Sequence, residues 1–191
     1  KGLNVPSEQV DTLMVVVDRA TAITDEATID EIDAAISQLI NVIVDNDSSQ
    51  KWISSWATAL HAPGGGDAEG FAGATIRQII SPTADGDYVR FRFSNEFGNR
   101  PLTLDRVGVA LAADGAEIVP DTHRDVTFEG KTSVTIPAGQ IIWSDPVDFK
   151  VTDDTPIAIS TYVAGITGPT TWKMRSMQTT YIAPLGDHTE A

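Results

Sequence analysis

The sequence predicts a mainly β protein: an antiparallel β-sandwich or jelly roll preceded by an N-terminal α-helical hairpin. Two observations support this class. Apolar residues recur every three or four positions in residues 1–48 but at every second position in most apolar stretches after residue 51. All 4 Trp, 3 Tyr and 6 Phe residues follow residue 51, and Gly2 is the only glycine before Gly64. We therefore expect two domains, a helical hairpin module at 1–48 and a β-sandwich domain at 49–191.

Residues 1–48 are expected to form two amphipathic helices. Apolar residues recur at helical spacing from Val10 to Val17 and again from Ile29 to Ile43. The segment 28–31 has the pattern of a capping box, and the short link at 24–27 predicts an antiparallel hairpin. Because two such helices bury little surface alone, a third element, the following domain or a partner chain must cover the apolar stripe.

The remaining chain alternates apolar and polar residues. This alternation predicts strands over 88–93, 107–111 and 157–163, each with one buried face. Shorter candidate strands, separated by turn dipeptides such as Asp85-Gly86, lie at 76–80, 126–128, 134–136, 141–143, 147–151 and 171–182. About nine short strands without helical spacing between them predict a sandwich or jelly roll, although the pattern leaves the strand order open.

Composition excludes several classes of protein. The chain has 13 Lys and Arg against 27 Asp and Glu, a net charge of −14, and its few basic residues are scattered, so a nucleic-acid partner is not expected. No apolar run approaches the roughly 20 residues of a membrane span. The absence of cysteine removes disulfides, thiolate metal sites and cysteine nucleophiles, but it leaves the compartment open.

A series of strings between residues 51 and 190 resembles one protein family. In order along the chain they are WISSWATA at 52–59, TIRQII at 75–80, YVRFRFSNEFG at 88–98, PLTL at 101–104, VGVAL at 107–111, SVTIPAG at 133–139, WSDPVD at 143–148, GPTTW at 168–172 and GDHT at 186–189. Together they resemble the N-terminal β-sandwich accessory domain of secreted bacterial SGNH/GDSL-type hydrolases. Residues 1–48 resemble, more weakly, the helical linker modules of bacterial surface glycosidases.

The resemblance implies an extracellular or cell-surface location and a parent esterase, but no catalytic residues in this chain. The family's nucleophile lies in a Gly-Asp-Ser string and its base in an Asp-x-x-His string, and neither string occurs here. We therefore expect a non-catalytic fragment, excised from its parent and ending near the start of the hydrolase domain. A triad built from His61, His123 or His188 is the alternative, although turn or surface histidines explain all three.

A sugar-binding face is the sharpest site hypothesis. Pyranose rings pack their C–H faces on aromatic rings, and their hydroxyls bind planar polar groups. Trp143 and Trp172 are the candidate platforms, with Arg90, Arg92 and Asn95 as polar partners. The alternative for the tryptophans is packing in the core or at an interface. The alternative for the arginines is a row of side chains that is exposed to solvent or faces another domain.

The remaining candidates are weaker. Trp52 and Trp56 are expected to pack. The pairs Asp85 with Asp87 and Asp153 with Asp154 could supply oxygen ligands for a structural calcium ion, but no EF-hand spacing is present and turn residues explain them equally. No other cofactor is expected.

Two roles remain open for the sandwich. It binds or positions a polysaccharide for the parent esterase, or it packs against the catalytic domain and shapes that domain's substrate wall. The acidic balance favours neutral or acetylated polymers, unless Arg90, Arg92 and neighbouring basic residues form a local patch.

Overall fold

The computed structural model describes residues 52–64, 70–173 and 179–191, and within these ranges every regular element is a β-strand. The predicted helical hairpin and the domain boundary after residue 48 lie outside the described residues. The strands are β1 (Ala74–Ile80), β2 (Gly86–Val89), β3 (Arg92–Ser94), β4 (Leu102–Leu104), β5 (Arg106–Leu111), β6 (Arg124–Asp125), β7 (Val134–Ile136), β8 (Ile141–Trp143), β9 (Val147–Val151), β10 (Ile157–Val163) and β11 (Thr180–Pro184). The predicted mainly β class is confirmed.

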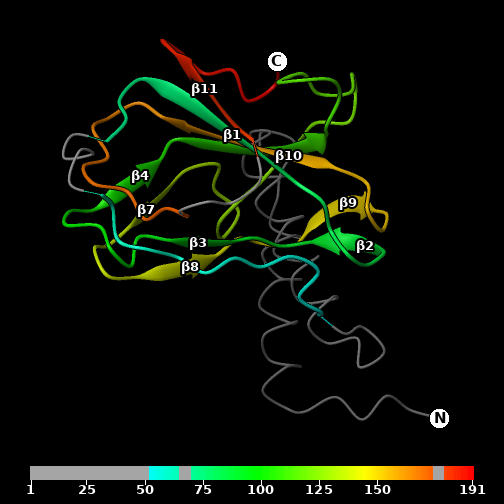
Figure 1. The fold of residues 1–191 in the computed structure, drawn as a ribbon, viewed down its shortest axis with the longest axis horizontal. Coiled ribbons are helices and arrows are strands. Elements are labelled where there is room, and N and C mark those ends of the chain that lie inside the picture. The colour runs from blue at the N-terminus through cyan, green and yellow to red at the C-terminus, as the bar shows by residue number, and fades with distance from the viewer. Residues whose placement is uncertain (1–51, 65–69, 174–178) are drawn as a thin grey trace, which may run out of the picture. The chain divides into compact units, whose positions relative to one another are not determined.

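One layer is a five-stranded antiparallel sheet with the order β11-β1-β10-β5-β6. Figure 1 labels three of its strands, β11, β1 and β10. The central strand β10 pairs with β1 on one side and with β5 on the other. Its inward residues Ile157, Ile159 and Val163 are buried in the core, as the alternating pattern predicts.

Three antiparallel pairs, β2-β9, β3-β8 and β4-β7, lie on the other side of the core (Figure 1). The β2-β9 and β3-β8 pairs are consecutive parts of the same two chain segments. Between them the Phe91 N–H donates to the Ser144 hydroxyl over 2.9 Å, and the Ser144 N–H donates to the Phe91 carbonyl over 2.8 Å. A side-chain hydroxyl thus satisfies a backbone donor where the regular ladder stops.

A single core joins the two layers. Ile80, Val107 and Ile159 from the sheet belong to the same buried cluster as Ile136 and Phe149 from the opposite pairs. The Phe93 ring packs edge-on against Phe128, with ring centroids 5.6 Å apart. Apolar contact across the layers is therefore what holds the strand pairs against the sheet.

The expectation of one buried face per strand is wrong for β5 and β10. Gly108 and Ala110 on β5, and Ala158 and Ser160 on β10, are buried although they alternate with core residues. The reason is that Arg77, His123 and the C-terminal residues cover the second face of the sheet, as described below. The predicted strand at 126–128 is also displaced: Val126 and Phe128 are core residues, but the strand itself is β6 at Arg124–Asp125.

Replacing Ile136 by alanine should strongly destabilise the fold, because this side chain is 0% exposed within the core. We expect the free energy of unfolding to fall by about 2–5 kcal/mol. Ile141→Ala, an exposed position on neighbouring β8, is the matched control and should cost much less. Urea titration of the 191-residue chain measures both, and equal losses would place Ile136 outside the core.

Candidate functional site

Three of the five predicted site residues meet on the outer face of the β3-β8 pair. Phe91 and Phe93 are partly buried against the core, which turns Arg90 and Arg92 outward, and the register places Arg92 directly opposite Trp143. The guanidinium carbon of Arg90 lies 4.9 Å from the centroid of the Trp143 ring, and that of Arg92 lies 5.9 Å from it. We call these three residues the Trp143 surface.

The Trp143 surface has the geometry of a cation–π cluster. Each guanidinium lies within the roughly 6 Å at which the ring quadrupole attracts a cation, and such contacts are worth about 0.5–1 kcal/mol at exposed sites. The Trp143 side chain nevertheless stays 54% exposed. The cluster therefore offers a partly restrained and exposed aromatic side chain with guanidinium groups over its ring, which can contact an apolar surface and donate hydrogen bonds from the guanidinium edges.

Trp172 has a different environment. Its indole N–H donates to the Ala62 carbonyl over 2.8 Å, and its backbone pairs with His61 through hydrogen bonds of 2.8 and 3.2 Å. The ring is 38% exposed, and no ring contact joins it to Trp143 in the described ranges. Trp172 thus joins the segment at 61–64 to the segment at 171–172 through its backbone and its indole N–H.

Asn95 lies inside the protein, at 2% exposure. Its amide nitrogen donates to the carbonyls of Arg100 and Ile136 over 2.9 and 3.0 Å, which ties the loop after β3 to the end of β7. A Cβ on Gly98 would lie 1.8 Å from the Asn95 amide oxygen, so only glycine fits beside it. Asn95 therefore organises a turn in this structure.

Asn95→Ala should reduce stability, because it leaves the buried Ile136 carbonyl and the part-buried Arg100 carbonyl without their donor. Loss of a buried hydrogen-bond partner costs about 1–3 kcal/mol. Ser94→Ala, at the neighbouring position, is the control, since the Ser94 hydroxyl accepts only an exposed hydrogen bond from the Glu96 N–H. Thermal unfolding of both variants tests this role. An Asn95→Ala variant as stable as Ser94→Ala would contradict it.

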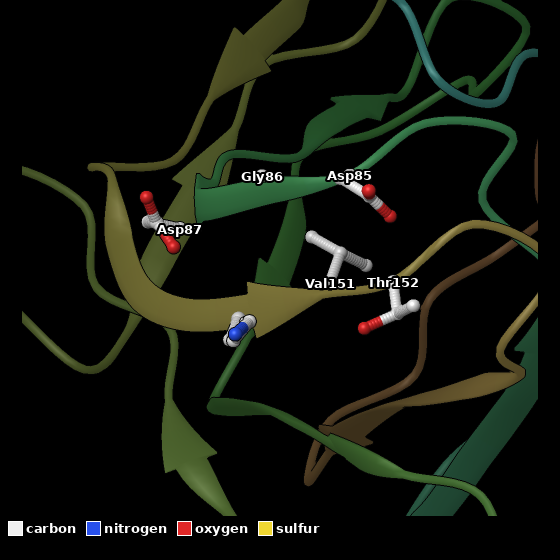
Figure 2. A pocket seen from close by; sticks show the side chains of 6 residues that line it. Asp85, Gly86, Asp87, Val151 and Thr152 are labelled. Atoms are coloured by element: carbon white, nitrogen blue, oxygen red, sulfur yellow. The ribbon is translucent and has the colours of Figure 1, made fainter.

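The acidic pairs considered for calcium do not form one cluster. Asp85 and Asp87 line an open hollow of about 380 Å³ together with Gly86, Lys150, Val151 and Thr152. Figure 2 shows the two carboxylates on either side of Gly86, apart from each other. An oxygen of Asp85 accepts the Asp153 N–H over 2.8 Å, as a turn residue does, and the ammonium group of Lys150 disfavours a cation nearby. The turn explanation is thus the one that the geometry favours.

A charged cluster on the outer face of the five-stranded sheet was not predicted from the sequence. Arg106 on β5 binds Asp125 on β6 through two hydrogen bonds of 2.9 and 3.1 Å. The same guanidinium contacts Glu190 and lies 3.7 Å from a carboxylate oxygen of Asp187. His123, Asp125 and Glu190 hold their ligand atoms close enough for a metal ion. However, Arg106 already supplies the positive charge there, so we interpret the cluster as an ion-pair network.

The C-terminal residues are fixed to this face by buried polar groups. The Thr75 hydroxyl donates to the Gly186 carbonyl and accepts the His188 N–H, and Arg77 donates to the His188 carbonyl over 2.8 Å. Arg77 also donates to the Ser160 hydroxyl over 2.7 Å and to the Ala116 carbonyl. The one sequence signal was an arginine inside the otherwise uncharged strand at 75–80.

The electrostatics of the cluster make the fold sensitive to acid. Burial lowers the pKa of His123 below 6.5, against the attraction of Asp125 and Glu190, because its ring packs on Gly108. The Asp125 hydrogen bond raises the pKa of Arg106 and keeps it charged. Burial alone would raise the pKa of Asp187, but hydrogen bonds from Thr189 and the charge of Arg106 outweigh burial and lower it.

We predict that His123 makes stability fall as the pH drops below 6.5. Its folded pKa is lowered, so the unfolded chain binds the proton more tightly, and the stabilisation is complete above 6.5 and lost toward the lower folded value. Urea midpoints measured from about pH 7.5 to pH 5 test this, with His123→Gln as the comparison. An identical slope in both proteins would exclude His123 as its source.

The comparisons with known proteins add no assignment. No protein-family model matches the chain, and no curated protein matches it. In the described ranges, no helix has the length and apolar character needed to cross a membrane.

Proposed function

We propose that this chain is a non-catalytic accessory domain, a β-sandwich of jelly-roll type, from a secreted bacterial SGNH/GDSL-like esterase. In this proposal it binds or positions a polysaccharide for a catalytic domain in the parent protein, outside the bacterial cell or at its surface. The two-layered antiparallel architecture and the resemblance of residues 51–190 both support this proposal.

The observation that carries the binding role is the Trp143 surface. A large aromatic ring that remains 54% exposed on a strand, away from the core, is available to a ligand. Its indole plane suits the C–H face of a pyranose, and the neighbouring guanidinium groups suit oxygen acceptors on the sugar. The outer face of β3 and β8 therefore combines the two kinds of contact that a sugar requires.

Affinity electrophoresis of the 191-residue chain in gels that contain different polysaccharides tests the proposal. At least one polymer should retard the protein, and Trp143→Ala should weaken that retardation about tenfold or more, as loss of a central aromatic contact does. Ile141→Ala removes an exposed apolar side chain from the same strand and should preserve binding. Binding that survives Trp143→Ala in a folded protein would place the site elsewhere.

A structural role is the second candidate, and exposed apolar residues at one sheet edge favour it. Strand β11 is an edge strand, Ile182 on it is exposed, and Leu185 directly after it is 89% exposed. Exposed apolar edges are commonly covered by another part of the protein. If no polysaccharide in a broad panel retards the chain, this role, packing against the parent's catalytic domain, replaces the binding role.

A further inference from the structure

We propose that the Trp143 surface takes an acidic saccharide, one whose sugar carries a carboxylate, in preference to a neutral one. This inference rests on the proposed binding function and names its ligand class. The net charge of −14 argues for neutral polymers, except where basic residues gather. Arg90 and Arg92 do gather, since both guanidinium groups lie against the one ring of Trp143.

Local charge decides the preference, because distant charges are screened. At physiological ionic strength the Debye length is about 8 Å, so acids on the other layer contribute little at this face. The acids next along these strands are Asp87 on β2, Glu96 in the turn after β3, and Asp148, which pairs with Tyr88. Asp145, which follows β8 closely, is buried and accepts the Thr127 hydroxyl over 2.8 Å. Two guanidinium groups thus lie over one ring, Asp145 is buried, and Asp148 lies on the outer face diagonal to Arg90, so Arg92 is the less compensated of the two cations.

Arg92 is the residue expected to bind the carboxylate. It is exposed, and within the described ranges it makes no ion pair with an acid. A guanidinium held against an aromatic ring keeps N–H donors at its edge, and these donors fit the two oxygens of a carboxylate. The Trp143 ring therefore positions Arg92 without consuming its hydrogen-bonding capacity.

The shape of an acidic sugar fits this arrangement. In a pyranuronic acid the equatorial carboxylate projects from the rim of the ring, close to its mean plane. When the C–H face of that sugar packs against the exposed part of the Trp143 ring, its carboxylate can reach the edge of a guanidinium group that lies over the same ring. One sugar unit can then make the aromatic contact and the charge-assisted hydrogen bonds together.

Matched polymers test the charge directly. Polygalacturonate and its fully methyl-esterified form share one sugar and differ in charge, while alginate and hyaluronan present other carboxylated sugars. We expect the chain to bind at least one carboxylated polymer about tenfold or more tightly than the neutral polymers, galactan and the methyl ester among them. This binding should weaken as salt is added.

Variants at Arg92 separate charge from geometry. Arg92→Gln should reduce binding of the carboxylated polymer about tenfold and weaken neutral binding much less, whereas Arg92→Lys should retain part of the affinity. Arg124→Gln, an exposed arginine on β6 in the other layer, changes the net charge equally and should have no effect. Far-UV circular dichroism confirms that each variant is folded.

The other possible results of these binding experiments overturn either the acidic ligand class or the binding function itself. Equal affinity for charged and esterified polymers, with loss of binding in Trp143→Ala, overturns the acidic ligand and keeps the binding function. Binding to dextran sulfate but to none of the carboxylated polymers overturns the carboxylate assignment. If the chain binds no polymer at all, both this inference and the proposed binding function fail.

Discussion

Packing of the partly buried Phe91 and Phe93 against the core is the constraint on which the candidate site depends. These rings pack against the shared core, so the residues between them and beside them must point to the outer face. A slip of one residue in the β3-β8 register would carry the arginines inward and the phenylalanines into water, at a cost of several kcal/mol. The apolar core therefore fixes the positions of Arg90, Arg92 and Trp143, although none of the three belongs to it.

The second face of the five-stranded sheet is covered by polar groups, and burying them costs free energy. Burying the Arg77 guanidinium costs desolvation energy, which lowers its pKa. Two carbonyls and the Ser160 hydroxyl accept its hydrogen bonds and offset that cost. Since one of those carbonyls belongs to His188, the arrangement also determines where the C-terminal residues run. A buried arginine here acts as a positioning group for the chain.

Sequence periodicity was enough to predict the β class, the inward and outward alternation of β3, and the outward position of Arg90 and Arg92. It failed where a second layer of contacts decides burial. Nothing in the local pattern shows that Arg77 and the C-terminal residues cover the face that carries Ser160, because their contacts join positions far apart in the chain. Asn95 and Trp172 illustrate the same limit, because their residue types suit a binding site. In the structure, however, Asn95 donates to the Ile136 carbonyl and Trp172 donates to the Ala62 carbonyl, so both side chains connect distant segments of the chain.

The contrast between net charge and local charge follows from the same long-range pairing. A count of acids and bases treats the chain as one average charge, and that average is strongly negative. Coulomb interactions at a protein surface act over roughly a Debye length, so the register between two strands matters more than the sum over the chain. In this fold β3 and β8, separated by some fifty residues in sequence, bring two guanidinium groups to one indole ring. An acidic protein can therefore present a cationic aromatic face to its ligand.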